Sequence, residues 1–322
     1  MTMASEPATV PIALDRISLL QANVEKVIRG KSEVVQLAIA GVLAHGHILL
    51  EDVPGVGKTT LAHALAKSLS LEFQRVQFTS DLLPSDIVGV TVFKQDSQEF
   101  EFMSGPVFTN VMLADEINRA TPKTQSALLE AMNEGSVTID KTRFPLPDPF
   151  LVIATQNPVE YVGTYPLPES QLDRFLMKLT LGYPDSSDEK DLLRAGGGQA
   201  ALHHLQPVIS LDDLRELQGQ VPSVHVKETL VDYMLQIIHA TRDHPEVALG
   251  VSTRGALTYF KACQAWAMVQ GRDYVIPDDV KKLSVPVLSH RVVLKERAMR
   301  RGDFAPEARF IQRLLAEVPV PR

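Results

Sequence analysis

A glycine-rich segment has the residues needed to hold a phosphate group. Residues 52–60 read Asp-Val-Pro-Gly-Val-Gly-Lys-Thr-Thr. Backbone N–H groups around Gly55 and Gly57 can converge on phosphate oxygens, because glycine tolerates the dihedral angles and the close approach that this requires. Lys58 adds a positive charge near the terminal phosphates, and the Thr59 hydroxyl is a ligand for Mg²⁺. The full pattern has glycine at the position of Asp52, so only Gly-Lys-Thr remains of it here. Whether this shorter motif binds phosphate must be judged from the elements on either side.

The residues on either side supply that context. Residues 47–50 form a short apolar run that fits a buried parallel strand. After the loop, Leu61, Leu65 and Leu69 lie four apart, on one face of a helix expected over residues 60–70. Strand, loop and helix thus follow the order of a phosphate-binding loop. The alternative is a glycine turn between a strand and a helix with an incidental lysine.

An acidic pair follows a second apolar run, at residues 111–114. Asp115 and Glu116 would lie at the carboxyl end of a buried strand, beside the mouth of the phosphate loop in a doubly wound sheet. Asp115 would then hold Mg²⁺ directly or through water, and Glu116 would orient or deprotonate an attacking water. In isolation, the pair could equally cap the turn that follows.

Bulk composition limits the partners and the location of the protein. The chain has 322 residues, enough for one large and one smaller domain, and its net charge of −7 argues against nucleic acid as the main partner. Its single cysteine, Cys263, excludes an internal disulfide framework and fits a buried thiol. The sequence shows neither an apolar stretch that spans a bilayer nor an export signal, so we expect a cytoplasmic protein.

Helices and strands alternate in the first part of the chain, which predicts an α/β three-layer sandwich with a parallel sheet. Strands are expected at residues 47–50, 76–78, 111–114 and 150–154, and helices at 12–27, 32–44, 60–70 and from the Thr121-Pro122 cap to Gly135. Residues 89–102 alternate in strand fashion and predict a hairpin insertion, and a shorter β signal covers 137–144.

The same patterns divide the chain into four regions. Residues 1–11 are small and polar and are expected to be disordered, and residues 12–185 form the nucleotide-binding core. Residues 186–204 are acidic and glycine-rich and are expected to be a linker. Residues 205–322 show helical patterns only, which predicts a small all-helical lid domain.

Four stretches together resemble the MoxR family of AAA+ ATPases. They are residues 49–59, 113–120, 153–158 and 167–175, and the resemblance runs from about residue 10 to the C-terminus. The family often lacks the first glycine of the loop. The resemblance implies a P-loop NTPase core and a helical lid, with ATP or ADP and Mg²⁺ as cofactors. The nucleotide would be held by Asp52, Pro54, Gly55, Val56, Gly57, Lys58, Thr59 and Thr60, with Arg29 and Gly30 lying against the adenine.

The resemblance also implies roles for polar residues farther along. Asn157 matches the sensor-1 residue that helps place the attacking water, although asparagine is also common in a turn before proline. Arg174 matches the arginine finger that enters a neighbouring subunit's site; Arg119 is the competing candidate, and a surface pair with Asp173 is the alternative role for Arg174. Arg254 resembles the sensor-2 arginine, which would touch the phosphates and report nucleotide state to the lid.

A finger supplied in trans implies a homo-oligomeric ring, a hexamer in this family. The resemblance therefore implies a chaperone-like remodeller that hydrolyses ATP to mature or metallate other protein complexes, with a client protein and a partner carrying a von Willebrand factor A domain. The hairpin resembles an insert that projects toward the pore, where Phe100 and Phe102 could touch the client. Alternatives are a metal-chelatase motor subunit, a nucleic-acid-dependent ATPase, or a nucleotide-gated scaffold with little turnover.

Overall fold

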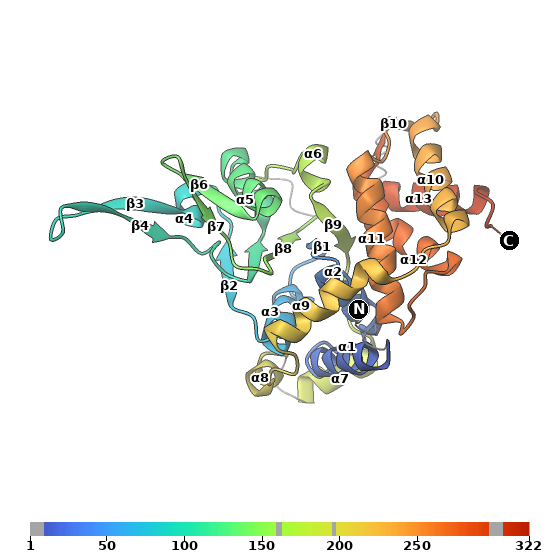
Figure 1. The fold of residues 1–322 in the computed structure, drawn as a ribbon, viewed down its shortest axis with the longest axis horizontal. Coiled ribbons are helices and arrows are strands. Elements are labelled where there is room, and N and C mark those ends of the chain that lie inside the picture. The colour runs from blue at the N-terminus through green and yellow to red at the C-terminus, as the bar shows by residue number, and fades with distance from the viewer. Residues whose placement is uncertain (1–9, 159–162, 195–197, 296–304, 322) are drawn as a thin grey trace, which may run out of the picture.

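A five-stranded parallel sheet forms the centre of the molecule (Figure 1). The computed structural model describes residues 10–158, 163–194, 198–295 and 305–321. The strands in spatial order are β2 (Phe73–Gln77), β5 (Val111–Asp115), β8 (Leu151–Gln156), β1 (His47–Glu51) and β9 (Phe175–Leu179). The sheet confirms the expected α/β fold, and all its strands end at one edge because they run in parallel.

Successive side chains of the strands pack into two separate apolar layers. In β1, Ile48 and Leu50 belong to one buried cluster and Leu49 to the other, as the two-residue period of a strand requires. Helices α4 and α5 contribute to the cluster of Leu49, whereas α1, α2 and α3 contribute to the other cluster. The helices of the core are α1 (Val10–Glu25), α2 (Ser32–Leu43), α3 (Lys58–Ser68), α4 (Pro84–Val88) and α5 (Pro122–Glu134).

The expected signals at both ends of α5 are present. The Thr121 hydroxyl accepts from the Thr124 amide, Pro122 opens the helix, and Gly135 follows it at φ 57°. The prediction of disorder for residues 1–11 lies almost wholly outside the described residues. Its boundary differs, since α1 already begins at Val10.

One strand was missed by the sequence analysis. The segment Phe175–Leu179 forms β9, which pairs with β1 at the edge of the sheet. It follows immediately on the Leu-Asp-Arg motif at 172–174, with only the short helix α6 (Glu169–Leu172) before it. The segment has four apolar residues and one lysine and shows no alternation of apolar and polar residues. Its pattern therefore does not distinguish a buried strand from a loop.

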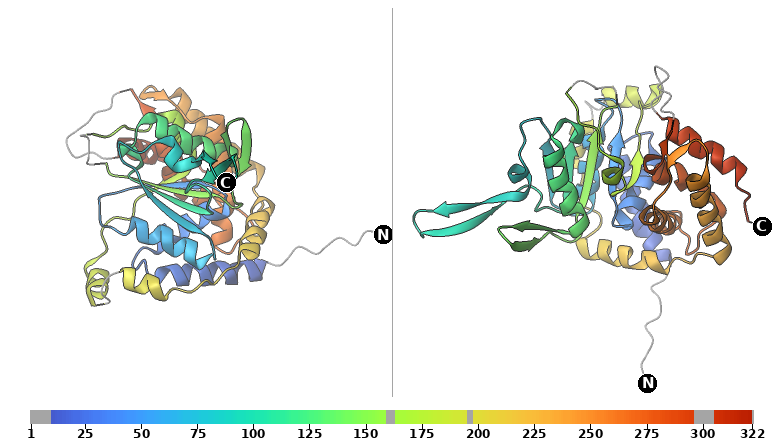
Figure 2. Two further views of the ribbon diagram at one scale, coloured as in Figure 1. Left: turned by 90° about the vertical axis from the view of Figure 1, so that its left-hand side faces the viewer. Right: turned by 90° about the horizontal axis from the view of Figure 1, so that it is seen from above.

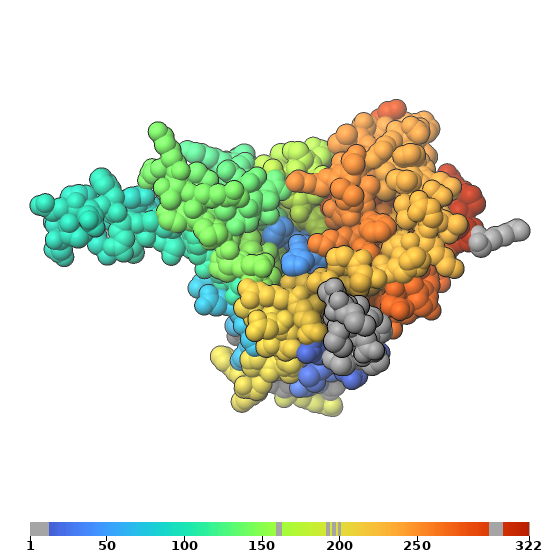
Figure 3. Space-filling view, in the orientation of Figure 1, coloured from blue at the N-terminus to red at the C-terminus, as the bar shows by residue number. Residues whose placement is uncertain are grey.

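Two antiparallel hairpins extend from the core. The first, β3 (Gly89–Lys94) with β4 (Glu99–Ser104), is a narrow arm that projects well beyond the body (Figures 2 and 3). The second, β6 (Ser136–Ile139) with β7 (Thr142–Pro145), matches the shorter β signal. Phe100 is 74% exposed on the arm, whereas Phe102 stacks on Phe144 with ring centroids 4.2 Å apart. Of these two phenylalanines, Phe100 is therefore the one whose side chain is exposed to a partner.

The C-terminal part of the chain is mainly helical. Two helices, α7 (Ser186–Arg194) and α8 (Gly198–His204), occupy the stretch expected to be a linker. The expectation of helices alone beyond residue 205 is wrong, because β10 (Val247–Leu249) pairs with β11 (Val293–Leu294). Such short strands carry too few residues to show alternation. The remaining helices are α9 (Leu211–Gln220), α10 (Glu228–Asp243), α11 (Thr253–Val269), α12 (Pro277–Leu288) and α13 (Pro306–Glu317).

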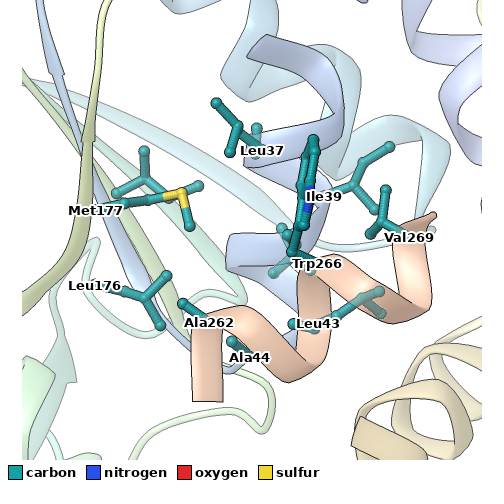
Figure 4. Close-up of a cluster of buried hydrophobic side chains, with 14 of the residues drawn as sticks. Leu37, Ile39, Leu43, Ala44, Leu176, Met177, Ala262, Trp266 and Val269 are labelled. Carbon is teal, nitrogen blue, oxygen red and sulfur yellow. The ribbon is translucent and has the colours of Figure 1, made fainter. Parts of the chain in front are cut away.

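Helix α11 attaches this lid to the core through a buried apolar contact. The Trp266 ring lies beside Ile39 and Leu43 of α2, with Met177 of β9 in the same cluster (Figure 4). One continuous hydrophobic cluster runs from Ala13 to Leu314, so core and lid share an interior. Cys263 is buried in it, as predicted. Within the described ranges, no helix is long and apolar enough to cross a membrane.

Candidate active site

The phosphate loop joins the end of β1 to the start of α3. Gly55 and Gly57 have φ values of 85° and 98°, in the left-handed region that favours glycine. A Cβ atom built on Gly55 would meet nothing within 4 Å, so the space over the loop is open. Lys58 Nζ donates to the carbonyl oxygens of Asp52 at 2.5 Å and Gln156 at 3.3 Å, and burial lowers the pKa of this ammonium. The lysine is thus held at the floor of an open cradle.

Asp52 has a structural role at the position where the full pattern has glycine. Its Oδ1 accepts from the Val53 amide at 2.8 Å and its Oδ2 from the Gly182 amide at 2.6 Å. The buried carboxylate thereby ties the loop to the segment after β9. This contact bridges 130 residues of sequence, which explains why the motif alone could not show it.

The acidic pair lies at the carboxyl end of β5, next to Thr155 of β8. The Thr155 hydroxyl donates to Asp115 Oδ1 at 2.7 Å and accepts from the Glu116 backbone amide at 2.8 Å. Glu116 itself has a φ of 56°, an unusual backbone conformation for a residue other than glycine. The threonine thus holds the Asp115 carboxylate and the backbone at the Glu116 bend.

Side chains of β2 complete this acidic site, and the sequence analysis did not find them. Arg75 donates to Asp115 Oδ2 from Nη2 at 2.6 Å and from Nε at 3.1 Å. Gln77 Nε2 donates to Glu116 Oε2 at 2.9 Å, and Arg119 Nη1 reaches the same oxygen at 3.2 Å. Since β2 and β5 are parallel neighbours, residues two apart on β2 reach adjacent carboxylates. The sequence offered one signal for these side chains, the spacing of two residues between Arg75 and Gln77. The strand was expected to begin only at residue 76, so Arg75 was left outside it.

One cavity of about 310 Å³ brings the predicted phosphate and metal residues together. Its lining includes Asn157, which is buried at the end of β8. The lining comprises Pro54, Gly55, Gly57, Lys58, Thr59, Thr60, Arg75, Asp115, Glu116, Thr155 and Asn157. Loop, acidic pair and Asn157 thus share one space, although the sequence separates Pro54 from Asn157 by about a hundred residues.

The residues at this cavity fit a magnesium ion that is held partly through water. A carboxylate offers about four acceptor positions, and three donors from Thr155 and Arg75 already reach Asp115. About one position is therefore left for a metal or a metal-bound water. The Thr59 hydroxyl at the start of α3 is the second oxygen available in the same cavity.

A second, smaller cavity of about 180 Å³ adjoins the loop on its other side. Arg29, from the segment expected to lie against the adenine, lines it. Gly30 has a φ of 68°, and a Cβ there would lie 1.7 Å from Asp188 Oδ2 of α7, so only glycine fits. The lining comprises Val27, Ile28, Arg29, Lys31, Gly55, Val56, Gly57, Thr60, Gly182, Pro184 and Gly198. Residues near the expected linker thus form part of this cavity.

The other predicted arginines lie away from the phosphate cavity. Arg174 donates from Nη1 to the Leu129 carbonyl at 3.0 Å, and its pKa is lowered by burial and by the charge of Arg254. Arg254 is exposed in the first turn of α11. Neither residue lines the cavity that contains Lys58. Asp173, the expected surface partner of Arg174, instead forms an ion pair with Arg291 at 2.8 Å.

Comparison with known proteins identifies the family. A model of the ATPase family associated with various cellular activities (AAA) matches residues 47–177, and a model of the AAA lid domain matches residues 239–313. A Mycobacterium tuberculosis protein named Chaperone MoxR1 is 42% identical over 309 residues, which cover 93% of this chain and 81% of that protein. This chain belongs to the MoxR family of AAA+ ATPases.

Two further relatives support the fold of this MoxR-family chain. The Bacillus subtilis protein YeaC, named as uncharacterized, is 50% identical over 299 residues that cover 93% of each chain. A Cytophaga hutchinsonii protein described as a candidate ATPase has a crystal structure with a TM-score of 0.88 and 38% identity, covering 97% of both chains. A AAA+ core with a helical lid is thus shared across the whole length of the chain.

Proposed function

We propose that this MoxR-family chain hydrolyses ATP in a Mg²⁺-dependent reaction. The observation that carries the proposal is the cavity that Lys58, Thr59, Asp115, Glu116 and Asn157 share. These residues come from two separate strand ends and one helix start, yet they meet around one space. This is the donor and acceptor set that phosphoryl transfer to water requires.

Each residue of the site has a defined task in this proposal. Amides of the loop and Lys58 bind the phosphate oxygens, and Glu116 orients the attacking water and accepts its proton. Asn157 holds the same water from the neighbouring strand end. A bound Mg²⁺, held by Thr59 and by Asp115 through water, would neutralise charge on the phosphates. The adenine would bind in the second cavity, which Arg29 lines and which Gly30 adjoins in sequence.

We further propose that the active form is a homo-oligomeric ring, with six subunits as the expected number. Arg174 lies outside the cavity of its own chain, which supports a finger that acts on a neighbouring subunit. Arg119 binds Glu116 of its own chain, which makes it the weaker candidate for a finger in trans. Arg254 would approach the phosphates from the lid.

The energy of hydrolysis would drive remodelling of a client protein. A relative carries the name Chaperone MoxR1, and the exposed Phe100 on the projecting arm offers an apolar contact. Maturation or metal insertion of another protein complex, together with a partner that carries a von Willebrand factor A domain, remains our prediction, as does a cytoplasmic location. The net charge of −7 disfavours the nucleic-acid-dependent motor.

The test is steady-state ATP hydrolysis measured over a range of protein concentrations, with the mass of the assembly recorded with and without ATP. We expect specific activity to rise with concentration as a ring-sized mass appears. Activity that stays flat in a monomer would remove the trans finger. Binding of ATP without turnover would favour the nucleotide-gated scaffold.

A further inference from the structure

Asp173 joins the segment that carries Arg174 to two elements of the lid. Its Oδ1 accepts from Arg291 Nε at 2.8 Å, and its Oδ2 accepts from the Ser252 hydroxyl at 3.0 Å. Arg291 belongs to the short helix η3 (Ser289–Arg291), and Ser252 caps the start of α11. One carboxylate on the core therefore contacts the lid at two points that are distant in sequence.

Arg291 is buried within this junction and is bound from several sides. Its side chain is 1% exposed and donates to the backbone carbonyls of Phe175 at 2.6 Å and Leu176 at 3.2 Å, the first two residues of β9. A Cβ on Gly255 would lie 2.8 Å from Arg291 Cδ, so α11 leaves room for the arginine only because residue 255 is glycine. A buried guanidinium with this many partners is a rigid connection.

The same junction carries both arginines that the proposed mechanism needs. Arg174 follows Asp173 directly, and Arg254 lies two residues after Ser252. The charge of Arg254 is close enough to lower the pKa of both Arg174 and Arg291. Two like charges held together are costly unless a nearby anion or a ligand offsets them. The carboxylates of Glu130, Asp173 and Glu134 offset this charge at Arg174. Of these three, Asp173 is the one that also binds Arg291 and Ser252 of the lid.

We propose that Asp173 is a positioning residue: it fixes the finger segment at 169–174 to the lid, so that Arg174 and Arg254 keep a constant spacing and move together when the lid moves. The inference rests on the proposed function, because it gives Asp173 a task in ATP hydrolysis. Asp173 would thus link the lid to the finger mechanically. When the lid of one subunit moves, Arg174 of that subunit would change its position relative to the nucleotide of the neighbouring subunit.

The test compares Asp173→Asn with wild-type protein in kcat and in affinity for ATP. Asparagine keeps the size of the side chain but loses the ion pair with Arg291. We expect kcat to fall by about 10- to 100-fold, because a small misplacement of a catalytic arginine has effects of this size. The Kd for ATP should change by less than about threefold. A kcat within twofold of wild type would overturn the proposal.

A double mutant separates positioning from general destabilisation. If Asp173 acts through Arg174, the Asp173→Asn and Arg174→Ala double variant should be no slower than Arg174→Ala alone. Losses that multiply would overturn the proposal. Asp279→Asn is the matched control, because Asp279 forms a buried ion pair with Arg272 inside the lid at 2.6 Å. It should lower stability and leave the kcat of folded protein unchanged.

Fluorescence of the single tryptophan, Trp266, reports whether each variant keeps its lid packed on α2. If Asp173→Asn loses this packing, Ser252→Ala replaces it, since that change keeps the ion pair and removes only the Ser252 hydroxyl, which donates to Asp173 and accepts from the Gly255 amide at the start of α11. We then expect kcat to fall by about fivefold, and an unchanged kcat would overturn the proposal. Wild-type protein that binds ATP without turnover would refute the proposed function instead, so the two failures are distinguishable.

Discussion

Thr155 and Asp115 are joined by a 2.7 Å hydrogen bond from the threonine hydroxyl to Oδ1, across two neighbouring strands. The same hydroxyl accepts from the Glu116 amide at 2.8 Å. One buried side chain therefore binds both the carboxylate of Asp115 and the backbone of Glu116, the residues that we propose to hold the metal and to activate water. Thr155 lies on β8 two residues before Asn157, and both line the cavity that contains the acidic pair.

Thr155→Val should lower kcat by about tenfold, because it removes both hydrogen bonds while keeping the shape of the side chain. Valine also leaves Asp115 Oδ1 without its donor, which should reduce the free energy of unfolding by about 1–3 kcal/mol. Thr155→Ser is the control and should keep most of the activity. ATPase rates and urea unfolding check the prediction, and a valine variant with wild-type turnover would contradict it.

Lys58→Ala and Glu116→Gln should separate binding from chemistry. The lysine variant should lose ATP affinity, because the phosphates lose the cation at the floor of the loop. The glutamine variant should bind ATP normally but hydrolyse it at least about 100-fold more slowly, because the amide cannot accept a proton from water. Fluorescent-nucleotide binding and phosphate release measure the two effects. Turnover that survives either change would mean that the site is elsewhere.

Mixed assemblies should reveal whether Arg174 acts between subunits. Arg174→Ala and Glu116→Gln proteins are each expected to be inactive alone. Mixed together, they create some interfaces in which an intact finger faces an intact glutamate, so part of the turnover should return. The same experiment with Arg119→Ala is the comparison. Rescue with Arg119→Ala but not with Arg174→Ala would reassign the finger.

His47 should make stability depend on pH. The Val152 amide donates to its Nδ1 at 2.9 Å, so Nε2 carries the proton and faces the Met132 carbonyl at 3.2 Å. Burial lowers the pKa of His47 to about 4, because the protonated ring would lose its hydration in the core. The unfolded chain takes up the proton near its ordinary pKa of about 6.5.

Stability from this residue is therefore fully present above about pH 6.5 and is lost as the pH falls toward about 4, by about 3 kcal/mol in total. Urea unfolding at a series of pH values measures the loss. His47→Gln offers a donor and an acceptor without titrating and should flatten the curve, whereas the exposed His204→Gln should not. Burial also lowers the pKa of His290, so this residue makes stability depend on pH in the same direction. Its contribution should remain in the His47→Gln variant. An unchanged slope in His47→Gln would contradict the assignment.

The candidate phosphate loop, the acidic pair and the alternation of strands and helices could be predicted from the residues alone. These are local patterns: glycines at fixed offsets around Lys58, two carboxylates after an apolar run, and helical or strand periodicity. For the same reason the hairpins and the capped helix α5 could be read directly. Short or uniformly apolar elements such as β9, β10 and β11 carry no period and could not.

The side chains that complete the site from distant parts of the sequence are known only from the way the chain folds. Arg75 reaches Asp115 across 40 residues because β2 and β5 are parallel neighbours, and Asp173 reaches Arg291 across 118 residues because η3 packs on β9. Which side chains form these hydrogen bonds depends on the order of the strands and on the packing of the lid. Both arise from the burial of apolar surface over the whole chain, and no local pattern records them.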